Sequence, residues 1–321
     1  MDPLGAGPMP ALGALLASPA TEIVLHDAAN DLKSLRTDYG WSATRVFDTR
    51  IAAQLLGMRA FGLASLLADL FGVKLAKKEK LQRADWSMRP LTAEMLAYAA
   101  QDTAHLLALC SRLRADLERA GRLAWAEEEF AALEHPVDVA EREPAFLRVK
   151  GAHALSARSL TALRDLVAWR DGIARQRDKA PFRIIGNEQL LAIAGDPPHA
   201  VADLARVRGA SPALLRERGA ELVDVIARVR ALPDADLVAL PRSDTRARDP
   251  ALEARIGRLK AARDAAAAKL GLDPGFIFGR GRLEAVALAR PRTLDELARV
   301  DGVRRWIIDV MGQELVAAAA R

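Results

Sequence analysis

Short apolar runs alternate with longer amphipathic segments in the first third of the chain. The run EIVLHD (22–27) predicts a buried strand, and NDLKSLRTDYG after it predicts a helix with Asn30 as its N-cap and Gly40 at its end. TRVFDTRIAAQLLG repeats this pattern, with a strand that ends near Asp48 and a helix that Gly57 closes. Alternating strands and helices predict an α/β layer architecture.

From about Arg112 onward the pattern is helical to the C-terminus, and it contains a repeat. With an offset of 93 residues, the segment from Trp169 falls on the segment from Ala262 without a gap. Pro181 then meets Pro274, and DLARVRG meets ELARVDG. The repeat predicts two copies of one small helical domain, joined by the polar, proline-flanked linker LPDADLVALPRSDTRARDP.

A chain of 321 residues is expected to fold as two or three domains. The predicted boundaries are residues 1–135 for the α/β domain, 136–233 for the first helical domain with its connecting helix, 234–250 for the linker and 251–321 for the second helical domain. Hydrophobic residues make up 51% and charged residues 28%, a balance that excludes wholesale disorder.

Several features bear on where the protein is found. No apolar run reaches the roughly 18 residues typical of a membrane span, so no membrane partner is expected. The N-terminal segment lacks the basic region that opens a secretory signal, which predicts that the chain is not exported. Cys110 is the only cysteine and cannot form an internal disulfide, so it is interpreted as a small buried side chain. We therefore expect a reducing, cytoplasmic location.

The net charge of +5 is distributed unevenly. Residues 1–150 contain 18 Lys and Arg against 20 Asp and Glu, whereas residues 151–321 contain 29 against 22. A basic C-terminal half beside a slightly acidic N-terminal half suits a protein that binds polyanions with one part and cations with the other. Arginine-rich, solvated helix faces explain the same charges equally well.

The stretch LTAEMLAYAAQDTAHLL (91–107) predicts a helix with Tyr98 and Asp102 one turn apart on the same face. Taken alone, this spacing more often means a packed tyrosine and a capping or paired aspartate. Asp31, however, follows the first predicted strand, near the sheet edge where α/β proteins place their sites. Carboxylates from a strand end and a helix face could hold divalent cations, and two such cations can activate water for phosphodiester hydrolysis.

These segments resemble the motifs of bacterial ribonuclease D, a 3′→5′ exoribonuclease family of the DEDD superfamily with a tyrosine in its third motif. LHDAANDLKSL resembles the second motif, DWSMRPLTAEMLAYAAQDTAHLL resembles the segment running into the third, and FDTRIAAQLLG and the spacing also fit. The helical repeat resembles two HRDC domains. The resemblance covers nearly the whole chain and implies a ribonuclease H-like α/β exonuclease domain followed by two all-α HRDC-like domains.

The resemblance also implies roles for individual residues. Asp102 would ligate a catalytic Mg²⁺ or Mn²⁺, Asp31 would ligate or orient a second ion through water, and Tyr98 would orient the attacking water. His26 is the histidine that often opens the second motif, and it is included among the expected nucleic-acid-binding residues.

The first helical copy offers a further candidate for nucleic-acid binding in RQRDKAPFRIIGN. It places four basic residues around one aromatic ring, a pattern suited to phosphate contacts beside a stacked base. These residues are Arg175, Arg177, Lys179 and Arg183. Phe182 itself is assigned to core packing.

One part of the family pattern is missing from this sequence. The family's first motif is D-x-E on the opening strand, but the only acidic residues before Asp31 are Asp2, Glu22 and Asp27. The N-terminal segment resembles the one that follows the family's third strand, so we expect an N-terminally incomplete exonuclease domain with an unpaired sheet edge. The missing part would span roughly 25–40 residues. A misassigned start is favoured over a degenerate copy, because Tyr98 and Asp102 remain in register.

The leading functional hypothesis is a hydrolase that removes nucleotides one at a time from RNA 3′ ends, as in tRNA maturation, with two divalent metal ions. The alternative is a non-catalytic nucleic-acid-binding protein with a degenerate nuclease domain. A single-stranded DNA exonuclease is a third option, because nothing in the sequence reads the 2′-hydroxyl group of RNA. No protein partner is expected.

Overall fold

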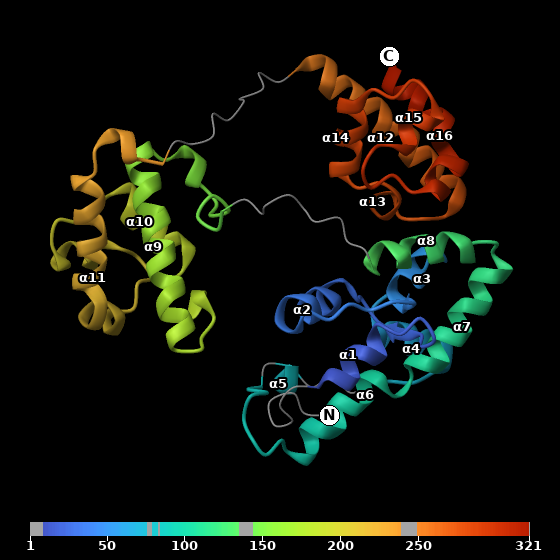
Figure 1. Cartoon of the computed structure of the whole chain (residues 1–321), viewed down its shortest axis with the longest axis horizontal. Helices are drawn as coiled ribbons and strands as arrows, with labels where there is room; N and C mark the ends of the chain where they lie inside the picture. Colours follow the sequence, from blue (N-terminus) through green and yellow to red (C-terminus); the bar gives the residue numbers. More distant parts are fainter. Residues whose placement is uncertain (1–8, 76–78, 83, 135–143, 239–248, 321) are drawn as a thin grey trace. The chain divides into compact units, whose positions relative to one another are not determined.

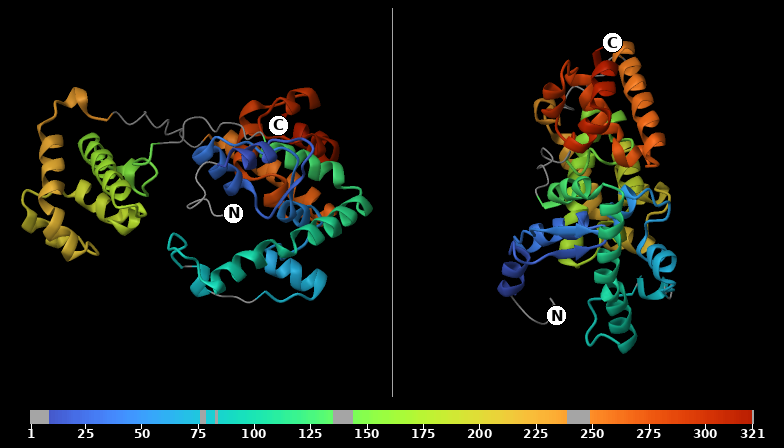
Figure 2. Two further views of the ribbon diagram at one scale, coloured as in Figure 1. Left: turned by 60° about the horizontal axis from the view of Figure 1, so that its bottom comes forward. Right: turned by 90° about the vertical axis from the view of Figure 1, so that its right-hand side faces the viewer.

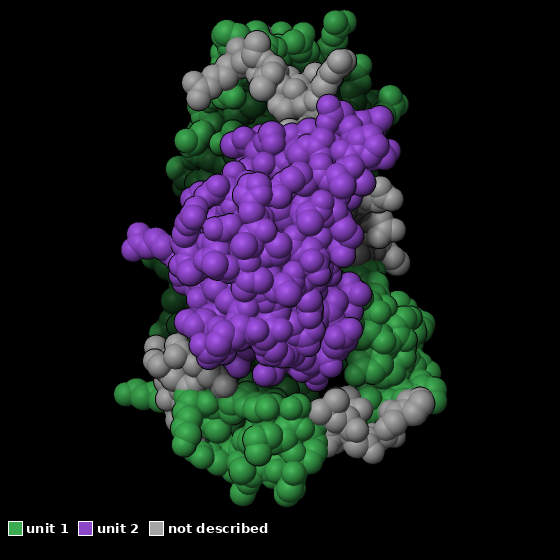
Figure 3. Space-filling model, turned by 90° about the vertical axis from the view of Figure 1, so that its left-hand side faces the viewer, with its two compact units in different colours: residues 1–137, 248–321 green, residues 138–247 purple. Residues whose placement is uncertain are grey.

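The structure is a computed structural model that describes residues 9–75, 79–82, 84–134, 144–238 and 249–320 (Figure 1). The chain forms two compact units, one of residues 1–137 with 248–321 and one of residues 138–247 (Figure 3). The second helical copy therefore belongs to the same unit as the α/β part, whereas the first copy is a unit by itself. The predicted domain boundaries stay a prediction.

The α/β part contains the two predicted strands, β1 (Ile23–Leu25) and β2 (Val46–Asp48), with α2 (Ala29–Tyr39) between them. The strands are parallel, and Val24 pairs with Phe47. The predicted helix end is confirmed, because Gly40 adopts the left-handed conformation with φ 70°. The predicted N-cap is wrong: α2 begins at Ala29. The preceding turn is set by Asp48, whose carboxylate accepts the backbone N–H of the buried Ala28.

The remaining helices of the α/β part are α1 (Pro10–Leu16), α3 (Thr49–Leu55), α4 (Leu63–Phe71), α5 (Glu79–Gln82), α6 (Ala93–Ala104), α7 (Leu106–Arg119) and α8 (Leu123–Glu134). The prediction of one helix over 91–107 is wrong at its end, because the chain breaks at His105 between α6 and α7. α7 buries Leu109 and three further side chains in the core, whereas α6 buries only Met95.

The two helical copies have matching elements. The first copy contains η1 (Ala152–Ala154), α9 (Ala157–Gln176), η2 (Pro181–Arg183), α10 (Asn187–Gly195), η3 (Val201–Arg206), α11 (Pro212–Ala231) and η4 (Asp234–Asp236), and the second contains α12 (Pro250–Leu270), α13 (Pro274–Ile277), α14 (Arg280–Ala289), α15 (Leu294–Ala298) and α16 (Arg305–Ala320). Five elements of the first copy begin 93 residues before their counterparts in the second. The repeat in the sequence is therefore a repeat of one fold. In the described part of the chain, no helix combines the length and the apolar character needed to cross a membrane.

Two pairs of glycines occupy matching positions in the two copies, and their backbone and packing explain why both copies have glycine there. Gly209 and Gly302 adopt φ values of 79° and 78°, where other residues are strained. Gly219 lies on α11, and a Cβ atom there would come within 2.8 Å of the Val201 side chain. A Cβ atom at the matching Gly312 would come within 2.8 Å of Leu294, the counterpart of Val201. The close packing at these two positions thus leaves little room for a side chain and favours glycine in both copies.

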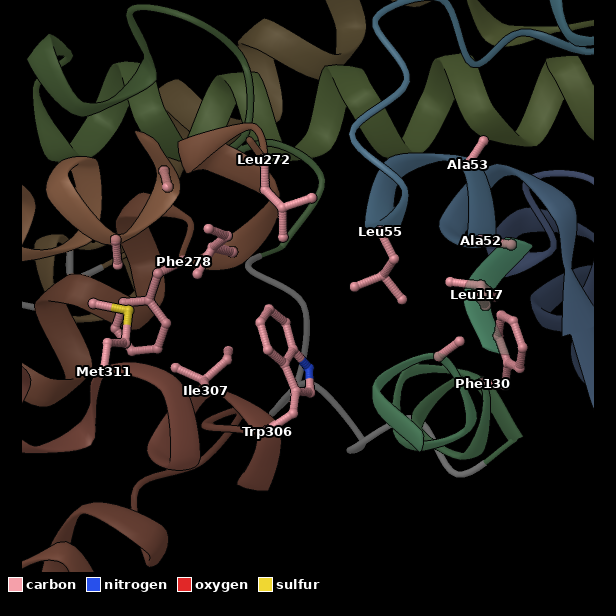
Figure 4. Packing of buried hydrophobic residues seen from close by; sticks show 14 of the residues in the cluster. Ala52, Ala53, Leu55, Leu117, Phe130, Leu272, Phe278, Trp306, Ile307 and Met311 are labelled. Carbon is pink, nitrogen blue, oxygen red and sulfur yellow. The ribbon is translucent and has the colours of Figure 1, made fainter. Parts of the chain in front are cut away.

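The α/β part and the second copy share one hydrophobic core. Figure 4 shows Leu272 and Trp306 on the side of the second copy and Leu55 and Leu117 on the side of the α/β part, all of them buried. The Trp306 ring also stacks on Trp125, with 4.9 Å between the ring centroids. The two parts are therefore packed as one body, while the first copy has its own core.

Two glutamates of α8 add polar contacts to this shared core. Glu128 accepts the backbone N–H groups of Arg305 and Trp306 at 2.6 and 3.0 Å, at the start of α16. Glu129 is 9% exposed and accepts the indole N–H of Trp306 at 2.9 Å. It also pairs with Arg304 at 3.2 Å. The negative charges lie at the positive end of the α16 helix dipole, where they are stabilising.

We expect Glu129→Ala to lower the free energy of unfolding of the unit by about 1–3 kcal/mol, because the buried indole N–H of Trp306 loses its acceptor. Urea unfolding followed by tryptophan fluorescence would measure the change. Glu127→Ala is the matched control, since Glu127 is exposed on the same helix. Equal stability of the two variants would contradict the role assigned to Glu129.

Candidate active site

Asp48 joins the two strand ends at the carboxyl edge of the sheet. Its carboxylate is 1% exposed and accepts four backbone N–H groups. Two belong to Asp27 and Ala28 after β1, at 3.2 and 2.7 Å. The other two belong to Arg50 and Ile51 in the first turn of α3, at 2.8 and 3.1 Å. A carboxylate so placed is a helix N-cap and at the same time holds the turn that leads into α2.

Asp48 is not among the site residues expected from the sequence. The signal was present, because an aspartate directly between an apolar strand and a helix is the typical N-cap position. Its second role, which is to hold the turn after β1, arises only from the pairing of the strands.

His26 lies beside this junction and is attached to it. Its Nδ1 atom is 2.9 Å from the Thr49 hydroxyl, which donates to the Leu25 carbonyl at 3.1 Å. Burial lowers the pKa of His26, against the opposing effect of Asp48 and Asp27. The imidazole is therefore neutral at pH 7 and offers hydrogen bonding but no charge to a phosphate. Its expected contact with nucleic acid stays a prediction.

Asp31 lies in the first turn of α2, close to the strand ends, as its position after the first strand predicted. Its pKa is raised, first by partial desolvation and then by the negative charges of Asp27 and Asp48. Asp27 is ion-paired with Arg50, and Asp48 is saturated by backbone amides. Asp31 is thus the carboxylate at this edge with oxygen atoms available to a cation.

Tyr98 and Asp102 lie together, as their spacing predicted. Both line a pocket of about 200 Å³ at the surface of α6, and the other lining residues are Leu63, Ala64, Leu75, Gln82 and Gln101. The Tyr98 ring is half-buried and lies 6.0 Å from the Trp86 ring, between centroids. Asp102 is exposed. A phenol and a carboxylate therefore face one small pocket with both polar and apolar walls.

The structure does not bring Asp31 to this pair. α2 and α6 lie apart in the views of Figures 1 and 2. Within the described ranges, no three or more His, Cys, Asp or Glu side chains gather into a group that could hold a metal ion. Asp31 and Asp102 have the oxygen donors that Mg²⁺ or Mn²⁺ prefers, but the described residues alone do not make a complete two-ion site.

The basic candidates lie in the other unit, and all four are exposed. They are Arg175 at the end of α9, Arg177 and Lys179 in the turn that follows, and Arg183 in η2. The core assignment of Phe182 is wrong, because its side chain is 72% exposed. Pro181 begins η2, and this turn directs Ile184 and Ile185 into the core instead.

Comparisons with known proteins agree with this architecture. Residues 1–118 match the family model described as 3′-5′ exonuclease, and residues 159–226 and 253–318 each match the HRDC domain. The chain is 33% identical to ribonuclease D of Granulibacter bethesdensis over 309 residues, 95% of this chain and 76% of that protein. It is 31% identical to ribonuclease D of Pseudomonas paraeruginosa over 322 residues, 99% and 83% of the two chains.

A solved structure gives the same result. The chain superimposes on Escherichia coli RNase D, described as an exoribonuclease involved in structured RNA processing, with a TM-score of 0.74 and 25% identity. The match covers 99% of this chain and 84% of that one. The predicted architecture, an exonuclease domain followed by two HRDC domains, is confirmed.

We expect Asp48→Ala to lower the free energy of unfolding by about 3 kcal/mol, since four backbone amides lose their acceptor. Asp48→Asn, which keeps one acceptor oxygen, should fall between this variant and the wild type. Urea unfolding measures both, and Asp38→Ala on the exposed face of α2 is the control. A loss no greater than that of Asp38→Ala would show that the junction does not depend on this carboxylate.

We expect Asp31→Asn to raise stability slightly at pH 7, by less than about 1 kcal/mol because the group is exposed. The folded-state pKa of Asp31 lies above its unfolded value, so ionised Asp31 destabilises the fold at neutral pH. The gain should shrink as the pH falls and Asp31 becomes protonated in both states. Urea unfolding between pH 7 and pH 4, with Asp38→Asn as control, measures this; a loss of stability at pH 7 would contradict it.

Proposed function

Because the chain belongs to the ribonuclease D family, we propose that it is a 3′→5′ exoribonuclease that removes nucleotides one at a time from RNA 3′ ends, such as those of tRNA precursors. The observation that carries this proposal is the placement of Tyr98 and Asp102 at one pocket. The phenol and the carboxylate come from one helix, so a single backbone segment presents both groups in a stable relation to each other.

In this proposal, the pocket receives the 3′-terminal nucleotide. Leu63, Ala64 and Leu75 provide apolar walls, and Gln82 and Gln101 provide amides that can donate and accept hydrogen bonds. The Tyr98 hydroxyl can hold a water molecule by a hydrogen bond. A phenol is a weak metal ligand, so it would not displace that water from a metal ion. Asp102 accepts hydrogen bonds from that water or binds a cation beside it.

We also propose that divalent cations, Mg²⁺ or Mn²⁺, would be held at two places, one by Asp102 on α6 and a second by Asp31 on α2. Such an ion lowers the pKa of bound water and stabilises the charge of the leaving group. The pKa of Asp31 is raised first by partial burial and then by the negative charges of Asp27 and Asp48, and a bound cation would offset that negative charge.

RNA is the proposed partner of the helical copies as well. The C-terminal half of the sequence carries the whole basic excess, and four of these basic side chains are exposed around an exposed ring in the first copy. Contacts of this kind act mainly through phosphate charges, so binding should weaken as salt is added.

One observation favours a second candidate, a non-catalytic RNA-binding protein. Of the carboxylates near Asp31, Asp48 is saturated by backbone amides and Asp27 is ion-paired. Asp31 and Asp102 lie on separate helices, so each would bind a cation with few protein ligands. In this case the helical copies alone would account for the interaction with RNA.

We expect the protein to shorten a 5′-labelled RNA from its 3′ end in Mg²⁺ or Mn²⁺ and to stop when EDTA is added. Asp102→Ala should slow trimming at least about a hundredfold, and Tyr98→Phe should cause a smaller loss. Gel analysis of product ladders over time measures both, with Asp38→Ala as a surface control.

The same assay separates the candidates. If the wild type leaves the RNA uncut in both metals but binds it with salt-dependent affinity, the exonuclease proposal fails and the second candidate stands. Equal trimming of single-stranded DNA would overturn the preference for RNA, and equal trimming of a tRNA precursor and an unrelated RNA would overturn the tRNA assignment.

A further inference from the structure

The two helical copies share one fold but differ in chemistry along one edge. In the first copy this edge is the turn from the end of α9 through η2, residues 175–183, which we call the basic edge. Its counterpart in the second copy, 93 residues later, is the turn from the end of α12 into α13, residues 268–276. Both turns contain a residue with positive φ at the same position, Asp178 with 47° and Gly271 with 66°.

Each basic residue of the first edge is replaced by an apolar residue in the second. The matching positions are Arg175 with Ala268, Arg177 with Leu270, Lys179 with Leu272 and Arg183 with Phe276, and Phe182 matches Gly275. The backbone is thus common to both copies, while these four positions are basic in the first copy and apolar in the second.

The apolar edge of the second copy packs against the α/β part through Leu272, with Leu270 and Phe276 partly buried and Ala268 exposed. Leu272 is only 6% exposed and belongs to the shared core. The guanidinium of Arg122 donates to the carbonyls of Leu55 and Leu270, both at 2.7 Å. At Gly57 a Cβ atom would lie 2.4 Å from the Gly271 carbonyl oxygen, so the two backbones are in direct contact. This edge is therefore a docking edge within the chain.

The basic edge of the first copy is open by comparison. Phe182 is 72% exposed, and the four basic side chains are exposed around it. Arg177 pairs with Glu217, whereas Arg175, Lys179 and Arg183 form no ion pair with any residue in the ranges that the structure describes. An apolar surface cannot cover these cations without a large desolvation cost, so the charges select a polyanionic partner.

We propose that the basic edge binds an unpaired segment of RNA, with a base stacked on Phe182 and phosphates on Arg175, Lys179 and Arg183. An exposed ring among cations is the arrangement that binds single strands, because every unpaired base has a face to stack and a phosphate beside it. In paired RNA the base faces are already stacked on each other. The proposal rests on the proposed function only in taking RNA as the substrate, and it assigns binding to the first copy and docking to the second.

The test is binding of the full chain to a fluorescein-labelled oligouridylate of about 12 nucleotides, measured by anisotropy in EDTA so that cutting is absent. We expect Phe182→Ala to raise Kd roughly tenfold and Phe182→Trp to keep wild-type affinity. The matched control is Leu288→Ala, which removes a side chain that is 50% exposed on α14 of the second copy.

The charges are tested by the salt dependence of Kd. For the Lys179→Ala and Arg183→Ala variants, the slope of log affinity against log salt should become shallower by about 0.7 each. Arg228→Ala is the control, because Arg228 is exposed on α11 and lies far from the basic edge. It is about 16 Å along the helix from Glu217, the residue that pairs with Arg177 of the basic edge.

The outcomes are distinct from those of the trimming assay. Wild-type affinity of Phe182→Ala, or equal Kd changes in Leu288→Ala, would overturn the proposal even if the protein trims RNA. The preference for unpaired RNA would be overturned if a blunt RNA duplex bound as tightly as the single strand and lost the same affinity in Phe182→Ala. Self-association that Phe182→Ala abolishes in sedimentation would instead assign the edge to a second copy of the chain.

Discussion

A single buried carboxylate organises the part of the candidate active site that lies at the strand ends. Asp48 accepts amides from the turn after β1 and from the first turn of α3, so two segments that are about 20 residues apart share one acceptor. His26 is attached to the same corner through Thr49, and Asp31 follows it on α2. Because its oxygens are occupied by the backbone, Asp48 positions the site rather than binding a ligand, and Asp31 is the carboxylate left for a cation.

The shared core gives the duplicated domain two different tasks. The second copy packs its apolar edge against the α/β part. Glu128 and Glu129 of α8 also accept hydrogen bonds from Trp306 near the start of α16. The first copy keeps the same backbone but carries charges and an exposed ring at that edge. One fold can thus serve as a fixed support in one position and as a binding surface in the other, because burial of an edge depends on its side chains and not on its helices.

Much of the fold was predictable because it is encoded locally or by repetition. The two strands, the helix end at Gly40 and the placement of Tyr98 and Asp102 on one face follow from short-range pattern. Other features were missed for tertiary reasons. The helix over 91–107 is divided at His105, where α7 begins and buries four side chains in the core. Phe182 is exposed, and the isoleucines after it are buried instead.

The sequence by itself determined the family, the repeat and the residues with the chemistry to act, since periodicity and motif spacing depend on neighbours along the chain. The tertiary structure decided which of them meet. Tyr98 and Asp102 share a pocket, Asp31 lies with Asp27 and Asp48, and only one of the two matching edges is buried. Burial, desolvation and the competition of backbone amides for a carboxylate are properties of packed surfaces, and they arise only when distant segments come together.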